Sequence, residues 1–155
     1  MSAPLDLRIE RTFAAPRSRV FAAWSDPEVL RRWWGAGPDW TSPSVEIDLR
    51  EGGRYRLAMQ NPGDGAVYTV GGEYVEVAPP ERLVSTWRWE TPGSPTADLT
   101  TLVTVEFVEL APDATTVVLT HTGFTDGEQR ERQSEGWAAC IANLDTRGLG
   151  GEPAA

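Results

Sequence analysis

Apolar and charged residues alternate at the start of the chain. In residues 5–13, LDLRIERTF, every second side chain as far as Ile9 is aliphatic. This period of two predicts a half-buried strand.

Two short helices are predicted next. Pro16 suits a first helical turn, and residues 20, 21 and 24 are apolar at helical spacing. Asp26 begins a second helix, because it offers an N-cap oxygen before Pro27 and a carboxylate, Glu28, in the first turn. That helix is expected to run to about Trp34.

From there to residue 122 the pattern is one of strands and turns. Alternating segments cover residues 45–50, 54–59, 67–77, 83–90, 100–110 and 117–121. Turns of hairpin length between them indicate an antiparallel sheet. Gly71-Gly72 lies inside the third segment and predicts a bulge or a sharp bend.

A long amphipathic helix is predicted after residue 126, with either Thr125 or Asp126 as its cap. Its apolar residues, from Trp137 to Leu144, follow the i, i+3, i+4, i+7 stripe. Gly148, Gly150, Gly151 and Pro153 are expected to end it. We expect one domain, residues 1–147, and a disordered tail, residues 148–155.

The order of elements predicts an α+β fold, in which the long helix covers one face of a curved antiparallel sheet of about seven strands. The two short helices leave space between sheet and helix, and such a concavity is a usual site for small apolar ligands.

Composition and charge exclude several classes of function. The net charge is −9 and every basic residue is arginine, so nucleic acid and membrane surfaces are not expected partners. The missing lysine removes Schiff-base and P-loop chemistry. Residues 1–13 contain no apolar segment typical of a signal peptide, and no run is long enough to span a membrane. We therefore expect a cytoplasmic protein in a reducing compartment.

Neither a metal nor a cofactor is expected. A single cysteine, Cys140, and a single histidine, His121, supply neither a disulfide nor a zinc cluster. The GxSxG, HExxH, GxGxxG and Walker patterns are absent from the sequence.

Several ordered segments match a known family. They are PRSRVFAAWSDPEVLRRWWG (16–35), DLREGGRYR (48–56), VGGEY (70–74), PPERLVSTWRW (79–89), TLVTVEF (101–107) and LTHTGF (119–124), with GW (136–137) in the last helix. Over residues 7–147 the chain resembles the homologues of the activator of heat-shock protein 90 ATPase, in the START-like (SRPBCC) superfamily.

The resemblance implies a helix-grip fold, with a seven-stranded antiparallel sheet around a C-terminal helix and an internal cavity. Superfamily members bind lipids, polyketides or hormones, and some are cyclases, hydrolases or resistance proteins. The family takes its name from a eukaryotic co-chaperone with a separate N-terminal domain, for which 155 residues leave no room, so we do not expect direct stimulation of a chaperone ATPase.

Aromatic residues are the main candidates for a binding site. The seven tryptophans suit the walls of a pocket for a flat apolar ligand, and an indole N–H can donate to a ligand carbonyl; bulky core packing is the alternative for each of them. With the inward positions of the strands and last helix, the expected ligand-binding residues are Trp33, Trp40, Tyr55, Met59, Trp87, Trp89, Phe107, His121, Trp137 and Ile141.

His121 is the first candidate for a catalytic group, because it alone titrates near neutrality. A hydrogen-bonded structural histidine is the favoured interpretation. Cys140 as a nucleophile activated by His121 is disfavoured, because a lone cysteine on an apolar stripe is usually inert.

The acidic residues favour structural roles. Glu46 and Asp48 are expected to form cross-strand ion pairs with Arg54 and Arg56 rather than a catalytic pair of carboxylates. Glu73 reaches inward only if a bulge at Gly71-Gly72 turns it.

Three functions remain open. The preferred one is a binding protein for a hydrophobic, aromatic or polyketide-like small molecule. The others are a cyclase- or hydrolase-type enzyme that uses the same cavity, and an interaction module for a chaperone or signalling partner. A homodimer is also left open.

Overall fold

One antiparallel sheet dominates the computed structural model, which describes residues 5–92, 94 and 99–149. In this part of the chain the strands are β1 (Leu7–Phe13), β2 (Thr41–Ile47), β3 (Arg54–Gln60), β4 (Val67–Ala78), β5 (Arg82–Trp89), β6 (Thr101–Ala111) and β7 (Ala114–Thr122). Their order in the seven-stranded sheet is β1-β7-β6-β5-β4-β3-β2. Apart from the β1–β7 pair, every neighbouring pair is consecutive in the chain, as hairpin-length turns predict.

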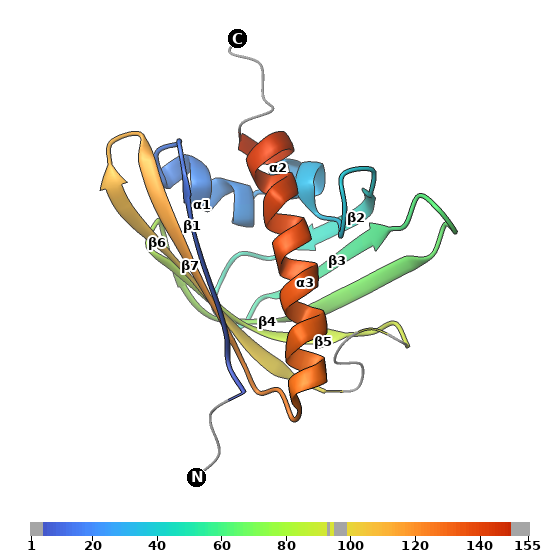
Figure 1. The fold of residues 1–155 in the computed structure, drawn as a ribbon. Helices are drawn as coiled ribbons and strands as arrows, with labels where there is room; N and C mark the ends of the chain where they lie inside the picture. Colours follow the sequence, from blue (N-terminus) through green and yellow to red (C-terminus); the bar gives the residue numbers. More distant parts are fainter. Residues whose placement is uncertain (1–4, 93, 95–98, 150–155) are drawn as a thin grey trace.

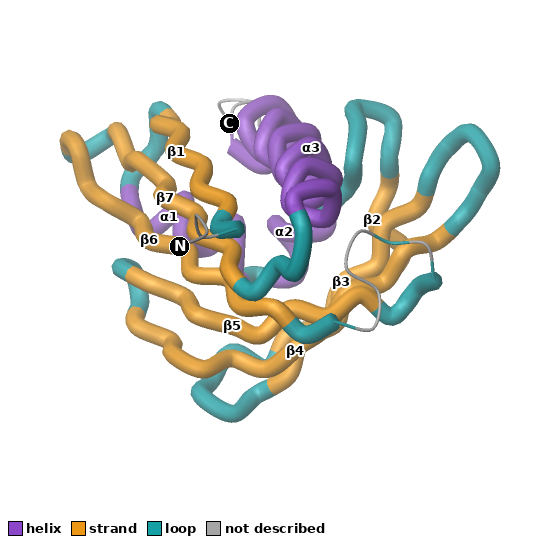
Figure 2. The backbone as a smooth tube through the Cα atoms, turned by 60° about the horizontal axis from the view of Figure 1, so that its bottom comes forward, coloured by secondary structure: helices purple, strands orange, loops and turns teal. Residues whose placement is uncertain are grey.

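The sheet curls around the last helix. The helices are α1 (Arg17–Ser25), α2 (Pro27–Trp33) and α3 (Gly127–Asn143), and α3 continues into a π-helical segment, η1 (Leu144–Leu149). Figure 1 shows α3 crossing the sheet, with α1 and α2 together at one end of it, and Figure 2 shows the strands as a trough that holds α3. This is the α+β helix-grip architecture that the sequence predicted. No helix in the described ranges is both long and apolar enough to cross a membrane.

Strand alternation places the bulky side chains on the face that α3 covers. The buried inward residues include Trp87 and Trp89 of β5, Val103, Val105 and Phe107 of β6, and Val117, Leu119 and His121 of β7. Because each of these strands turns a continuous row of apolar side chains toward one helix, the core lies between the sheet and α3.

The predicted helix starts are confirmed by their caps. The Asp26 carboxylate accepts a hydrogen bond from the Glu28 N–H at 3.0 Å, with Pro27 as the first residue of α2. At α3 the Asp126 carboxylate accepts from the Gln129 N–H at 2.8 Å. Each cap satisfies a donor that the helix leaves unpaired.

The last helix runs past the first of the glycines expected to end it. It continues as η1 to Leu149, which is buried, so Gly148 lies inside this segment. Arg11 donates to the Asp145 carboxylate at 2.8 Å and Arg19 donates to the Leu149 carbonyl at 2.9 Å, so β1 and α1 hold this last turn in place. Of the predicted tail, residues 150–155 lie outside the described residues.

The glycine pair in β4 has a different role from the predicted bulge. The irregularity in the β4–β5 register falls between Tyr74 and Glu76. At Gly72 a Cβ atom would overlap the Thr86 carbonyl oxygen of β5, so this glycine permits a close approach of two strands. Glu73 is not turned inward: it is exposed, with a carboxylate oxygen 3.9 Å from Arg54 Nε.

The expected ion pairs between β2 and β3 are replaced by others. Arg56 stands opposite Glu46 in register, but its guanidinium binds both carboxylate oxygens of Glu90 at 2.9–3.1 Å. Gly71 of β4 lies between these partners, and a Cβ there would come 3.3 Å from a Glu90 oxygen. The bare glycine thus lets Arg56 reach across β4, while Asp48 pairs with Arg50 at 2.9 Å.

Candidate functional site

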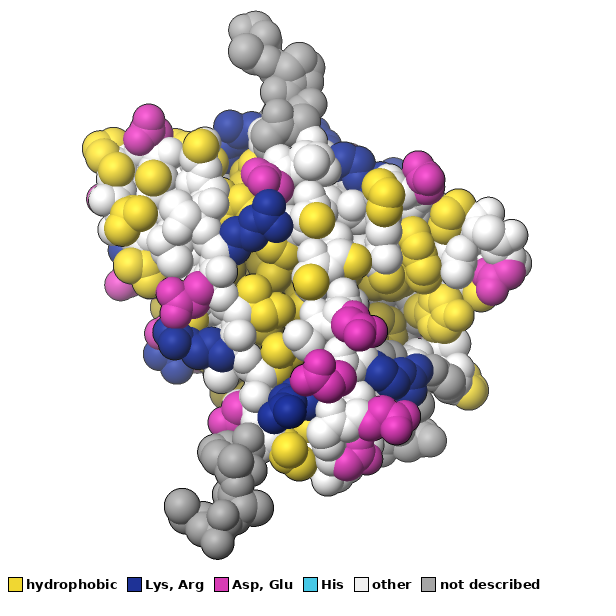
Figure 3. All heavy atoms as spheres, viewed as in Figure 1, with side chains coloured by type: hydrophobic (Ala, Val, Ile, Leu, Met, Phe, Trp, Pro, Cys, Tyr) yellow, Lys and Arg dark blue, Asp and Glu magenta, His cyan; other side chains and the backbone are white. Residues whose placement is uncertain are grey.

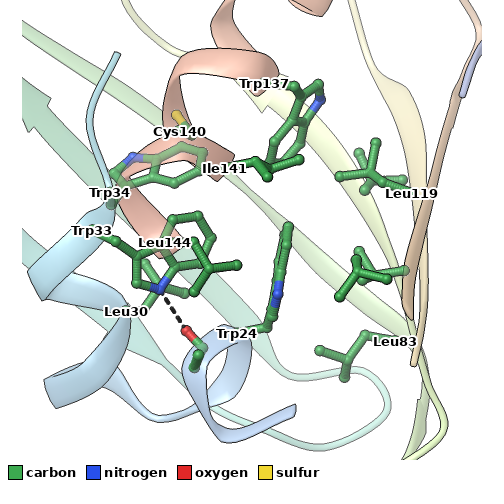
Figure 4. Packing of buried hydrophobic residues seen from close by; sticks show 14 of the residues in the cluster. Trp24, Leu30, Trp33, Trp34, Leu83, Leu119, Trp137, Cys140, Ile141 and Leu144 are labelled. Carbon is green, nitrogen blue, oxygen red and sulfur yellow. Dashed lines mark hydrogen bonds between the residues drawn. The ribbon is translucent and has the colours of Figure 1, made fainter. Parts of the chain in front are cut away.

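An aromatic cluster fills the space between α1, α2, β5 and α3. Trp137 lies at its centre, with ring centroids 5.9 Å from Trp24, 5.8 Å from Trp34 and 4.9 Å from Trp87. Figure 4 shows Trp24, Trp33 and Trp34 meeting Trp137 and Ile141 of α3, and the dashed line marks the Trp33 indole donating to the Ala23 carbonyl at 2.8 Å. The Trp34–Trp137 contact is edge-to-face and the other two are tilted, and such packing favours one fixed arrangement of the rings.

A cleft of about 370 Å³ lies beside this cluster, between α3 and strands β3, β4 and β5. Figure 3 shows hydrophobic side chains gathered between α3 and strands β2 and β3. The cleft is lined by Trp34, Ala36, Trp40, Met59, Tyr68, Trp89, Ser94, Arg132, Gln133, Glu135, Gly136, Trp137 and Cys140. Its charged lining residues, Arg132 and Glu135, are exposed, so the charges lie at the rim and the deeper wall is aromatic and neutral.

A second, much smaller cavity lies deeper. It measures about 50 Å³ and is surrounded by Trp24, Leu30, Trp33, Trp34, Tyr55, Leu57, Tyr74, Leu83, Ser85, Trp87, Val103, Val105 and Trp137. We call it the inner cavity. Trp34 and Trp137 line both spaces, so these two indoles separate the cleft from the inner cavity.

The residues predicted to line the ligand site divide into three groups. Trp40, Met59, Trp89 and Trp137 line the cleft, whereas Trp33, Tyr55 and Trp87 line the inner cavity. Phe107, His121 and Ile141 line neither of them, although all three are buried. Phe107, for example, packs edge-to-face on Phe21 of α1 at 5.2 Å, as a core residue.

Both ring nitrogens of His121 form hydrogen bonds inside the core. Its Nδ1 accepts from the Trp137 indole N–H at 3.1 Å, which places the ring proton on Nε2, 2.6 Å from the Thr101 hydroxyl oxygen. The Thr101 hydroxyl in turn donates to the Trp87 carbonyl at 3.1 Å. Burial lowers the pKa of His121 to about 3. A neutral ring with both nitrogens engaged is a poor acid or base at neutral pH.

Cys140 belongs to the wall of the cleft but is not activated. Burial raises the pKa of its thiol to about 12, so the reactive thiolate is scarce at neutral pH. The disfavoured Cys140–His121 pair gains no support from this arrangement, because each group is held in its neutral form.

Two polar residues on the apolar stripe of α3 shape the cleft. Gln133 accepts from the Trp89 indole N–H at 3.0 Å and so fixes that ring in the wall. Asn143 donates to the carbonyls of Gly35 at 2.9 Å and Gly37 at 2.8 Å, which ties the loop after α2 to α3. Both residues are buried, so water does not compete for their hydrogen bonds.

That loop carries the outer wall of the cleft. Arg147 donates to the Trp40 carbonyl at 3.1 Å, and the Trp40 ring lies 6.0 Å from Tyr68 of β4. Sequence reasoning counted Trp34 among the aromatic candidates for the wall but missed Gln133 and Asn143. The signal for these two was a polar side chain in register with Trp137 and Cys140 on an otherwise apolar helix face.

The described residues contain no group of three or more His, Cys, Asp or Glu side chains placed to hold a metal ion. The cleft therefore offers ring faces, a thioether and a few hydrogen bonds. These are the means by which proteins bind and orient a small apolar molecule.

Comparison with known proteins places this geometry in context. A family model described as Activator of Hsp90 ATPase homolog 1-like protein matches residues 14–147. A search of the curated proteins found no match to the chain.

Solved structures share the fold over almost the whole chain. A protein from Arthrobacter aurescens is 27% identical with a TM-score of 0.80, and the match covers 97% of this chain and 88% of that one. The AHSA1 protein from Silicibacter pomeroyi is 29% identical with a TM-score of 0.76, covering 91% and 95%. An HSP90 activator from Plasmodium falciparum is 23% identical with a TM-score of 0.68, covering 91% and 94%, and at that identity the likeness concerns the fold alone.

Proposed function

Since this chain belongs to the Activator of Hsp90 ATPase homolog 1-like protein family, we propose that it uses the family's fold to bind a hydrophobic, flat aromatic small molecule in the cleft beside α3. The observation that carries the proposal is the wall itself. Trp40, Met59 and Trp89 face a space of about 370 Å³, which lies within the usual range for ligand pockets.

Binding rather than turnover is the function that the site supports best. His121 was the weak candidate for a catalytic group and Cys140 a disfavoured one, and burial favours the neutral form of both. The net charge of −9 supports a neutral ligand over nucleic acid or an anionic membrane surface. A reducing, cytoplasmic location completes the proposal, and the free thiol of Cys140 is consistent with it.

Native mass spectrometry of the purified protein against flat aromatic compounds and fatty acids tests the proposal. We expect retention of at least one aromatic compound, with an affinity in the micromolar range or better. Failure to retain any compound of the panel would count against a ligand-binding function and would favour the interaction-module alternative.

Trp40→Ala is expected to weaken binding of the best aromatic compound by about tenfold or more, since it removes a large apolar face from the wall. Trp40 is half-buried, so the fold should survive its loss. Isothermal titration calorimetry of the variant gives the affinity without relying on tryptophan fluorescence.

Leu110→Ala is the matched control for Trp40→Ala. Leu110 is an apolar residue on β6, 66% exposed and outside the cleft, and its loss should leave the affinity unchanged. Equal affinities for wild type and Trp40→Ala would contradict the assignment of the cleft as the binding site.

A further inference from the structure

Trp34 occupies a special position in the binding site. It follows α2 directly and lines both the cleft and the inner cavity. Its ring is held by edge-to-face contacts with Trp33 at 6.0 Å, Trp87 at 5.7 Å and Trp137 at 5.8 Å. The orientation of its N–H is therefore set by packing before any ligand arrives.

The Trp34 N–H has no hydrogen-bond partner, although it is buried. The other buried indoles of the cleft wall are satisfied, because Trp89 donates to Gln133 and Trp137 donates to His121. Unpartnered buried donors also occur at Trp24 and Trp87, which line only the inner cavity, and at the Ser94 hydroxyl in the cleft wall. In Figure 4 the Trp34 nitrogen lies on the side of its ring away from Ile141. A contact between an N–H and the face of an aromatic ring is much weaker than a hydrogen bond to an oxygen. The unpartnered N–H therefore favours a ligand that carries a hydrogen-bond acceptor.

The acceptor that fits here is neutral. The charged residues of the cleft wall, Arg132 and Glu135, are exposed at the rim. The thiol of Cys140, in the same wall, is held protonated by burial. A carboxylate or phosphate carried inward to Trp34 would leave water without meeting a cation, which is strongly unfavourable.

Resting on the proposed function, we infer that the ligand is a neutral, flat carbonyl compound, such as a ketone, quinone or ester, whose oxygen accepts a hydrogen bond from Trp34 Nε1. The aromatic walls bind the ring system, and Trp34 selects the carbonyl. A cleft of about 370 Å³ lies near the lower limit of ligand pockets and suits a single fused ring system.

Fluorene and 9-fluorenone form a matched pair of probes. They share one flat tricyclic skeleton and differ in a CH2 group against a C=O group. Because burial of a carbonyl without a donor is unfavourable, a purely apolar wall would bind fluorene more tightly. We expect wild-type protein to bind fluorenone at least tenfold more tightly than fluorene, as measured by calorimetry or native mass spectrometry.

Trp34→Phe keeps an aromatic ring and removes the N–H. In this variant we expect the preference for fluorenone over fluorene to disappear, because no N–H remains at this position to bind the carbonyl. Trp40→Phe is the control, because it makes the same substitution elsewhere in the cleft wall and should keep the preference. Circular dichroism confirms that both variants are folded.

The outcomes separate this inference from the proposed function. If fluorene and fluorenone bind wild type equally, or if Trp34→Phe keeps the preference, Trp34 is not the selecting donor and the inference is overturned while ligand binding stands. If neither probe binds wild type, the cleft is not a site for flat aromatic compounds and both proposals fail. If Trp34→Phe does not fold, the inference is decided by Trp34→Met, whose side chain has no hydrogen-bond donor: a retained preference overturns the assignment and a lost preference supports it.

Discussion

Replacing Trp137 by alanine is expected to lower the free energy of unfolding by about 3–5 kcal/mol, the range found when a large buried aromatic side chain is removed. Only 2% of Trp137 is exposed, and its ring contacts Trp24, Trp34 and Trp87. The substitution opens a cavity at the centre of the aromatic cluster. It also removes the hydrogen bond to His121 Nδ1.

Urea denaturation followed by far-UV circular dichroism measures this loss without depending on tryptophan fluorescence. Trp137→Phe leaves a smaller cavity, since it keeps one aromatic ring but removes the rest of the indole together with the N–H donor. We expect a loss of about 1–3 kcal/mol for Phe. Trp40→Ala is the control for removal of a half-buried indole and should destabilise much less. A Trp137→Ala protein within about 1 kcal/mol of wild type would contradict the central role of this residue.

Trp137 is a poor choice for testing the binding site. Trp137 lines the cleft, yet it also supports the fold, so weaker binding by Trp137→Ala would not separate ligand contact from unfolding. Trp40 and Trp34 are better choices. Trp40 is half-buried, and Trp34→Phe preserves a ring where packing needs one.

The strand pattern explains why so much of the fold could be predicted. Alternation along Val103, Val105 and Phe107, and along Val117, Leu119 and His121, indicates which side of each strand is buried, because successive side chains point to opposite faces. A local signal also sufficed at Asp26, where the capping oxygen lies next to the donor that it satisfies, and narrowed the cap of α3 to Thr125 or Asp126.

Long-range packing explains what the sequence alone could not establish. Whether a tryptophan lines the cleft or the core depends on how α2, β5 and α3 meet, and Trp33 and Trp34 are neighbours with different roles. The end of η1 depends on Arg11 and Arg19, more than 100 residues away in sequence. Arg56 lies between the carboxylates of Glu46 and Glu90. Its ion pair is with Glu90, because Gly71 has no side chain to block the way across β4.

Buried polar residues were the least predictable part of the site. Gln133 and Asn143 lie among apolar residues of α3, and their partners are a tryptophan of β5 and the loop after α2. A helical periodicity marks such positions as exceptions but does not name their partners. His121 could be assigned to the inward face, whereas its neutral state depends on Thr101 and Trp137, which lie on β6 and α3.

Acidification is expected to destabilise the protein through His121 by about 2 kcal/mol between pH 8 and pH 5. Burial lowers the pKa of His121 to about 3 in the folded state, against about 6.5 in the unfolded chain. Between pH 6.5 and pH 3, His121 is protonated in the unfolded chain but stays neutral in the folded protein. The free energy of unfolding is therefore not reduced by His121 above pH 6.5. It declines by about 1.4 kcal/mol per pH unit as the pH falls from there toward 3.

His121→Gln provides the comparison that isolates this effect. Glutamine does not titrate, and its amide can donate to Thr101 as Nε2 does. The acidic residues contribute equally to both proteins, so the difference between their unfolding free energies should narrow by about 2 kcal/mol from pH 8 to pH 5. Protonation of His121 would also bring an Nδ1–H against the Trp137 N–H, which donates to that atom at 3.1 Å. Parallel stability curves for the two proteins would show that His121 titrates normally in the folded state, and that the hydrogen-bonded link from Trp137 to Thr101 does not hold it neutral.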